Sequence, residues 1–299
     1  MTAAPALRGR DIALVLVIVA VWAINFLTSA LGLREIPPVL FTALRFGLLL
    51  LPLLFLMKKP PAGQWARLFA VSIFVGVIHF SLSFLALKLA GDLSSPAIVL
   101  QSYVPMTTVL AWWLLGEKVG WRTSSAIAIS FLGVLVLGLD PHMLQKPDAL
   151  AAMLASALAL AIGTILMKGL RGLDVYSQQG WMAVFSLPPL LLLSVWLEPG
   201  AIANLPNASW VAWLGAAFAA YASSLLGHGL YYWLVQRHPV AQITPWLLLV
   251  PVFAMILGIL FWGDQPGPRV LIGGAMVLSG VLVIAVRAGL KSRTLPDPA

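Results

Sequence analysis

The sequence contains no cysteine and few charged residues. Without cysteine the chain cannot form disulfides, thiolate metal sites or iron–sulfur clusters, and it has no cysteine nucleophile. Only 9% of its 299 residues are charged, 61% are hydrophobic, and the mean hydropathy is +0.98. Because a water-soluble domain of this size needs far more polar surface, this composition predicts a membrane protein.

Motifs of the common catalytic sites are also missing. The chain has no GxxxxGK[ST] phosphate loop, no HExxH zinc motif and no GxSxG nucleophile motif. All ten acidic residues lie at the ends of the apolar stretches or between them, so no carboxylate is available at membrane depth for a metal ion or for acid–base chemistry. We therefore expect neither an enzyme nor a bound cofactor or metal, with an intramembrane enzyme as the less favoured alternative.

Ten apolar stretches account for most of the chain. A membrane-spanning helix needs roughly 20 apolar residues, and these stretches lack the alternation of a membrane strand. The expected fold is an all-α integral membrane protein with ten transmembrane helices. The first stretch resembles a signal peptide, but no cleavage site follows it, so we expect an uncleaved span. The predicted spans, numbered in chain order, are residues 11–32, 36–57, 66–89, 94–115, 122–139, 149–168, 176–197, 210–235, 240–262 and 269–288.

The basic residues gather on one side of these spans. Thirteen of the 18 lysines and arginines lie on the side of the two termini, and four lie on the other side. This asymmetry predicts that both termini are cytoplasmic. It also explains the net charge of +8 without a basic patch, so we expect no nucleic acid partner. The four residues on the opposite side are Arg34, Lys88, Lys146 and Arg269.

The chain contains an internal repeat. An offset of 147 places Glu117 on Asp264, and an offset of 149 places His79 on His228. Each copy holds five spans, and because five is odd the second copy must be inverted in the membrane. Inverted repeats of this kind build many secondary transporters. The predicted division is a first repeat over 1–140, a second over 141–290 and a cytoplasmic tail over 291–299.

Several short motifs in the two repeats resemble those of a known protein family. The segment Trp22–Phe26 (WAINF) resembles a WG-x-NF signature, and Phe41–Phe46 (FTALRF) resembles an Arg-Phe motif of the second span. Pro105 followed by Gly116-Glu117, and Pro251 followed by Gly263-Asp264, resemble the ends of two repeats. On these residues the chain resembles the EamA branch of the drug/metabolite transporter superfamily, and overall it is most similar to the YddG-type exporters. It departs from the pattern at Ala23, where glycine is usual, and at Asp264, where glutamate is usual.

The resemblance implies ten helices in two inverted halves around a central cavity, lined mostly by spans 1, 3, 4, 6, 8 and 9. It further implies export of amino acids, including aromatic ones, or of similar small metabolites across a bacterial inner membrane by alternating access. The alternative within transport is a broad-specificity exporter of cationic or aromatic toxic compounds. Proton antiport and facilitated diffusion both fit the sequence. We expect a monomer in the lipid bilayer, because the repeats supply two-fold symmetry within one chain.

Polar residues recur along the third and eighth spans at helical spacing. Ser72, Gly76, His79 and Ser83 follow i, i+4, i+7 and i+11, which is one face of an α-helix. The related residues of the eighth span are Tyr221, Ser224, His228 and Tyr232. Both histidines are expected about 14 Å from an interface, near the midplane. These stripes are candidates for binding substrate, and the alternative is that each histidine bridges two helices.

Prolines interrupt the fourth and ninth spans at matching places. Interrupted helices in equivalent positions of two halves point to a transporter site, although proline is also common in membrane helices generally. The polar and aromatic neighbours of Pro105 and Pro251 are therefore candidate ligands. They are Gln101, Tyr103 and Trp246, and Trp22 and Asn25 of the first span join them, with helix packing as the alternative for Trp22.

Arg45 is the one charged residue deep within a predicted span. An intramembrane charge is a functional hypothesis by default. Arg45 either contacts a substrate carboxylate or locks the structure through backbone carbonyls of the broken helices. Glu117 and Asp264 lie at the ends of the fourth and ninth spans, where we expect them to hold helix ends or gates together. Their expected partners are Lys118, Arg122 and Arg269.

Overall fold

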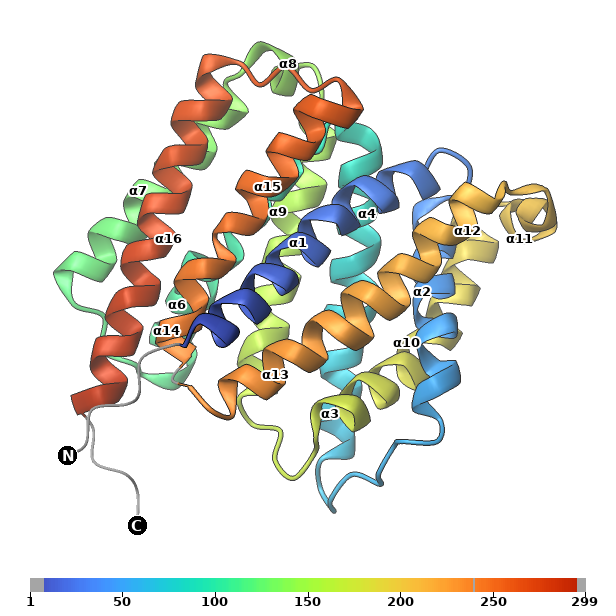
Figure 1. Ribbon diagram of the computed structural model, residues 1–299, viewed down its shortest axis with the longest axis horizontal. Helices are drawn as coiled ribbons and strands as arrows, with labels where there is room; N and C mark the ends of the chain where they lie inside the picture. Colours follow the sequence, from blue (N-terminus) through green and yellow to red (C-terminus); the bar gives the residue numbers. More distant parts are fainter. Residues whose placement is uncertain (1–7, 239, 295–299) are drawn as a thin grey trace.

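The computed structural model describes residues 8–238 and 240–294, and in this part of the chain every regular element is helical (Figure 1). Nine of these described helices are long and apolar enough to cross a membrane. The predicted all-α membrane fold is therefore confirmed. A shorter apolar helix of 16 residues, α2 (Pro38–Leu53), falls where the second span was expected. The number of ten spans and their orientation stay predictions.

The uninterrupted helices begin and end within a few residues of the predicted spans, except that α2 is shorter. The last helix is longer than predicted, because residues 291–294 of the expected tail continue it; residues 295–299 lie outside the described part. Besides α2, the uninterrupted helices are α1 (Gly9–Gly32), α7 (Trp121–Gly138), α9 (Pro147–Met167), α10 (Val175–Leu197) and α16 (Pro268–Thr294).

Four spans are built from consecutive helical segments. The third consists of α3 (Trp65–Val71), η1 (Ser72–His79) and α4 (Phe80–Ala90), and the eighth of α12 (Trp210–Ala217), η3 (Phe218–His228) and α13 (Gly229–Val235). The fourth consists of α5 (Ser94–Leu100) and α6 (Tyr103–Leu115), and the ninth of α14 (Val240–Leu247), α15 (Leu249–Leu257) and η4 (Gly258–Trp262). Short connecting helices are α8 (Pro141–Leu144), α11 (Ala201–Asn204) and η2 (Leu205–Asn207).

The prolines explain the breaks in the fourth and ninth spans. Pro105 has no N–H to donate to the Gln101 carbonyl, and the helix is interrupted at Gln101 and Ser102. Pro251 likewise cannot donate to the carbonyl of Leu247, after which the ninth span is interrupted. The two breaks therefore occupy equivalent positions in the two repeats.

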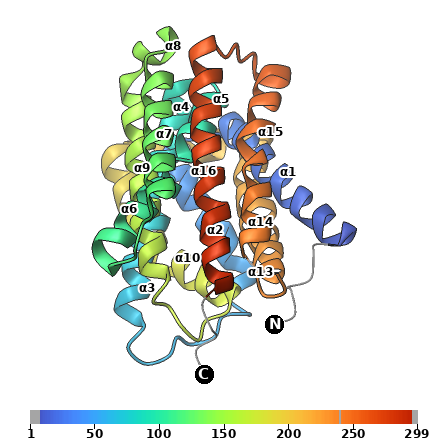
Figure 2. The same ribbon diagram turned by 90° about the vertical axis from the view of Figure 1, so that its left-hand side faces the viewer.

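The helix contacts follow a two-fold pattern. α2 packs on α10, α7 on α16, and α5 on α15, so each of these spans contacts its repeat equivalent. α1 packs on α12 and η3, and its equivalent α9 packs on η1 and α4. Figures 1 and 2 both show α7 lying along α16. α1 starts at the end of the bundle where α16 finishes, whereas α9 starts next to α8 at the opposite end (Figure 1). The first helices of the two halves thus run in opposite directions.

Glu198, which directly follows α10, binds the first turn of α2. Its carboxylate accepts hydrogen bonds from the backbone N–H groups of Val39 (2.8 Å) and Leu40 (2.9 Å). These N–H groups have no partner within the first helical turn, and a negative charge there also interacts favourably with the positive end of the helix dipole. We expect Glu198→Ala to lower the free energy of unfolding by about 2 kcal/mol, measured by SDS titration in mixed micelles. Glu198→Gln keeps one acceptor oxygen and should lose less; equal stability of the alanine variant and wild type would contradict this role.

Candidate functional site

The third and eighth spans share a helix geometry that ends at a histidine in both. η1 and η3 are π-helices, and their last residues are His79 and His228. π-Helical turns with i→i+5 hydrogen bonds are rare and occur frequently at functional sites. The two histidines, which the repeat places on each other, therefore occupy equivalent positions in the fold.

His79 joins η1 to α9. Its Nδ1 lies 2.8 Å from Ser156 Oγ and 3.2 Å from the Ser156 carbonyl oxygen, and Ser156 Oγ donates to the His79 carbonyl at 2.9 Å. Because a carbonyl only accepts, Nδ1 carries the proton, and Nε2 of the neutral ring is an acceptor. The bridge between helices that we gave as the alternative is thus present, and it orients a ring whose second nitrogen can still accept a hydrogen bond.

His228 has the same tautomer and an aromatic neighbour. Its Nδ1 lies 3.1 Å from the Ser223 carbonyl oxygen, which also accepts from Trp22 Nε1 at 3.2 Å. The centroids of the Trp22 and His228 rings are 5.1 Å apart, and Tyr231 lies 6.0 Å from Trp22. Trp22 therefore packs between α1 and the eighth span. Tyr231 was not among the predicted ligands, because the helical spacing pointed to its neighbour Tyr232.

The prediction that each polar stripe lies on one helix face is wrong. Gly76 packs closely against Ser186 of α10, whereas His79 contacts α9. In η3, Ser224 contacts the second span, while Tyr221 is exposed over 37% of its surface and is not brought to these contacts. An i→i+5 turn holds more residues than an α-turn, so a stripe spaced for 3.6 residues drifts around a π-helix.

Buried polar atoms without partners lie on α1, on α14 and at the break of the fourth span. α1, α5 and α15 pack through Ala23, Ala97 and Ala254. Asn25 Oδ1 on α1 is buried without a hydrogen bond partner. The same is true of Ser102 Oγ at the break of the fourth span and of Gln242 Oε1 on α14. A buried polar atom that lacks a partner costs about 1–3 kcal/mol, so these atoms are suited to a polar ligand. Ser102, three residues before Pro105, and Gln242, three residues before Pro245, were not among the predicted ligands.

The other predicted ligands are half-buried within the bundle. Gln101 lies in the break of the fourth span and Tyr103 is the first residue of α6. Trp246 packs with the apolar cluster formed by α1 and the ninth span. The remaining two are Ser83 on α4 and Tyr232 on α13.

Arg45 lies between the third and eighth spans and is 2% exposed. Its Nε donates to Ser224 Oγ of η3 at 3.0 Å, and its guanidinium carbon lies 3.9 Å from the ring centroid of Phe80, the residue after His79. Its partners are thus a hydroxyl and an aromatic ring, where we expected backbone carbonyls. The four ion pairs among the described residues do not include Arg45, so a buried cation is present without a carboxylate.

Glu117 and Asp264, which the repeat relates, bind different partners. Glu117 forms an ion pair with Lys168 at 2.8 Å, and its side chain is 53% exposed. Asp264 is 7% exposed and binds the start of α5. Neither Lys168 nor the start of α5 was among the expected partners, because the spacing of residues does not show which helix ends meet. Within the described residues, no group of three or more potential ligands could hold a metal ion.

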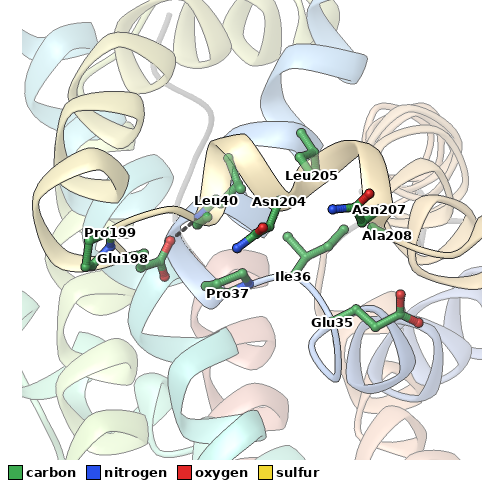
Figure 3. Close-up of a pocket in the computed structure, with 11 residues that line it drawn as sticks. Glu35, Ile36, Pro37, Leu40, Glu198, Pro199, Asn204, Leu205, Asn207 and Ala208 are labelled. Atoms are coloured by element: carbon green, nitrogen blue, oxygen red, sulfur yellow. Dashed lines mark hydrogen bonds between the residues drawn. The ribbon is translucent and has the colours of Figure 1, made fainter.

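A surface pocket of about 500 Å³ opens beside the connections 33–37 and 198–208 (Figure 3). Its two carboxylates accept hydrogen bonds at the starts of helices. Glu198 binds the start of α2, and Glu35 accepts from the N–H and hydroxyl of Ser209, both at 2.6 Å. These hydrogen bonds lower the pKa of Glu35. Since neither carboxylate is available to a ligand, the histidines, Arg45 and the broken helices form the better candidate site.

Comparisons with known proteins agree with this architecture. A probable amino-acid metabolite efflux pump of Escherichia coli strain K12 is 26% identical over 282 residues, which covers 92% of this chain and 94% of the relative. A probable terminal-alkyne amino-acid exporter of Streptantibioticus cattleyicolor is 26% identical over 70% of each chain. A solved crystal structure, 16% identical, covers 96% of this chain and 100% of its own with a TM-score of 0.61. At that identity the likeness shows the fold alone.

The family model matches most of the chain in two segments. Residues 10–139 and residues 148–286 each match the EamA-like transporter family. Each segment contains one of the two spans whose π-helix ends at a histidine and one of the two spans that are broken beside a proline. The chain therefore belongs to the EamA-like transporter family.

Proposed function

We propose that this protein exports amino acids, including aromatic ones, by alternating access between two inverted halves of five spans. In this proposal both termini are cytoplasmic, the protein lies as a monomer in a bacterial inner membrane, and rocking of the halves opens the central site to one side at a time. The names of the relatives from Escherichia coli and Streptantibioticus cattleyicolor support a small-molecule exporter of this kind.

The observation that carries the proposal is a buried guanidinium that lies between the two spans whose π-helices end at a histidine. Arg45 contacts the residue after His79 and, through Ser224, the π-helix that ends at His228. An amino-acid zwitterion has a carboxylate that complements a guanidinium and an ammonium group that complements an imidazole acceptor. The two ends of such a substrate therefore match the charge and the hydrogen-bonding character of this site.

The broken helices supply the remaining polarity and the freedom to move. The fourth and ninth spans are interrupted at equivalent positions, and unpaired polar atoms lie at or near both breaks. Interrupted helices at a repeat interface combine polar backbone with hinge points. We place the side chain of the substrate near Gln101, Tyr103 and Trp246, and the changes between states at the turns before Pro105 and Pro251.

Counterflow of labelled amino acids into liposomes tests the proposal. Wild-type protein should accumulate label, and His79→Ala should raise the substrate KM by about tenfold through the loss of one hydrogen bond. The matched control is Ser156→Ala, which removes the partner of Nδ1 but keeps the imidazole ring. If both variants lose transport equally, His79 acts only as a bridge. Absence of counterflow with every amino acid, in protein shown to be folded, would overturn the proposed function.

A further inference from the structure

A second pocket lies at the end of the bundle opposite the termini. It has a volume of about 340 Å³ and lies among three connections, those that precede α5, α9 and α16. Four titratable side chains line it, namely Asp92, Asp140, His142 and Asp264. None of these residues belongs to the proposed substrate site, which lies near the middle of the spans.

Asp264 has one carboxylate oxygen that is fully engaged and one that has no partner. Oδ2 accepts from the N–H groups of Leu93 (2.9 Å) and Ser94 (3.0 Å) and from the Ser94 hydroxyl (2.5 Å). Oδ1 is buried without any hydrogen bond partner, in a residue that is only 7% exposed and lines the pocket. A buried charged oxygen without a donor is costly, and a proton that neutralises the carboxylate lowers that cost.

Asp92 is a second poorly neutralised carboxylate in the same pocket. Its Oδ1 accepts from the N–H of Ser95 at 2.7 Å, and its Oδ2 lies 3.4 Å from His142 Nε2, which is longer than a good charge-assisted hydrogen bond. Burial raises the pKa of Asp92, and the charge of Asp264 raises it further. Two carboxylates that share a buried pocket favour the binding of one proton between them.

No lysine or arginine around the pocket forms one of the described ion pairs with Asp92 or Asp264. Lys146 donates to the carbonyl of Ala90, and its Nζ also lies 3.3 Å from His142 Nε2. Arg269 donates to the carbonyl of Leu139, and Arg34 stacks on the Trp262 ring at 4.2 Å. Asp140 accepts from the N–H of His142 within its own connection. Among the described residues that surround the pocket, the pair of His142 with Asp92 is the one ion pair formed. The lysine and arginine side chains therefore do not neutralise the two carboxylates, and an exchangeable proton can.

We propose that Asp264 and Asp92 together bind one exchangeable proton and that this proton controls the opening of this end of the transporter. The inference rests on the proposed transport function, which it deepens by naming the coupling ion. A proton from bulk water bonds to the unpaired oxygen of Asp264 or to Asp92, and it returns to water when the site closes. No other covalent bond forms or breaks.

The consequence for the fold follows from what Asp264 holds. α5 is the first half of the broken fourth span, and its start is tied by Asp264 to the connection before α16. Neutralising the carboxylate weakens these charge-assisted bonds, so the start of α5 separates from Asp264 and the pocket widens. Low pH therefore favours the open end, and high pH favours the closed end seen here.

Because the chain has no cysteine, one introduced cysteine can report this opening. Val270 lines the pocket and is 3% exposed, so Val270→Cys should react with a maleimide only when the end opens. The reaction is followed in nanodiscs without substrate between pH 8 and pH 5. Dividing by the rate of the exposed Gln145→Cys corrects for ionisation of the thiol. We expect the corrected rate to rise roughly tenfold, which corresponds to a tenfold shift in the open population.

Three variants in the Val270→Cys background decide the assignment. Asp264→Asn imitates the protonated acid, so labelling should be fast at every pH. Asp92→Asn removes the neighbouring charge, so the transition should move to lower pH. Asp148→Asn removes an exposed carboxylate at the start of α9 that does not line the pocket, so it should behave as the Val270→Cys parent does. A corrected rate that does not depend on pH, or an unchanged transition in folded Asp264→Asn or Asp92→Asn, would overturn the proposal.

The same variants separate this proposal from the proposed function. Labelling needs no substrate, so pH-dependent labelling in a protein without amino-acid counterflow contradicts only the amino-acid assignment. In the converse case, counterflow persists and labelling shows no response to pH, which contradicts only the proton site. If both proposals hold, Asp264→Asn retains exchange of amino acids but loses their accumulation against a gradient driven by pH.

Discussion

Replacing Arg45 with glutamine is expected to raise the KM for amino acids by roughly 10- to 100-fold, because a charge-assisted hydrogen bond contributes about 1.5–3 kcal/mol. Nε of Arg45 is held by Ser224 Oγ, so its two Nη atoms are the donors that remain for a carboxylate. Initial rates of transport into liposomes, measured for phenylalanine and for phenylalanine amide, give the two KM values. The amide has no carboxylate, so its KM should stay the same or fall in Arg45→Gln.

The comparison of acid with amide separates binding from structural support. Ser224→Ala keeps the charge of Arg45 and removes only the anchor of Nε, so we expect a change in KM of less than about threefold. If Arg45→Gln slows the acid and the amide equally, or if it does not fold while Arg45→Lys does, Arg45 stabilises the structure and does not bind the carboxylate. A buried uncompensated cation also disfavours cationic substrates, which argues against the alternative exporter of cationic compounds.

Replacing Gly133 with alanine is expected to lower the free energy of unfolding by about 2 kcal/mol or more through overpacking. A Cβ atom on Gly133 would lie 2.7 Å from the Gly273 carbonyl oxygen and 2.8 Å from the Val277 backbone nitrogen of α16. These neighbours are main-chain atoms, so they can yield only if the two helices separate. Gly273 approaches α7 equally closely, which shows that the interface is built on backbone contact. SDS titration in mixed micelles measures the change.

Gly47→Ala is the matched control, because Gly47 is also a glycine inside a helix. A Cβ atom at Gly47 meets only Leu187 Cδ1 at 3.9 Å, which is an ordinary contact. Alanine is the better helix former by about 0.5–1 kcal/mol, so Gly47→Ala should leave stability unchanged or raise it. The two substitutions are chemically identical, and opposite signs therefore report the packing of α7 on α16. Equal effects on stability would show that α7 and α16 do not pack through backbone contact at Gly133.

The linear pattern of residues determined much of the architecture. Apolar runs of about 20 residues have few alternatives to a membrane helix, because an unpaired backbone in lipid is costly. The ends of most spans were therefore predicted within a few residues. The exception is α2, which ends at Leu53 and is shorter than predicted. The breaks beside Pro105 and Pro251 were also predictable, since the missing N–H acts on the helix that contains it. The internal repeat could be read from offsets alone.

The tertiary structure decided which groups meet. The π-helices rotated the polar stripes away from one face, which a pattern based on 3.6 residues per turn does not show. The partners of Arg45 and Asp264 are Ser224 and Ser94, which lie 179 and 170 residues away in the chain. Such contacts depend on how helices cross, and helix crossing is set by packing across the whole bundle. Spacing along one helix holds no information about it, so the sequence alone predicted where the helices lie and where two of them break, whereas only the packed bundle shows which groups meet at the candidate site.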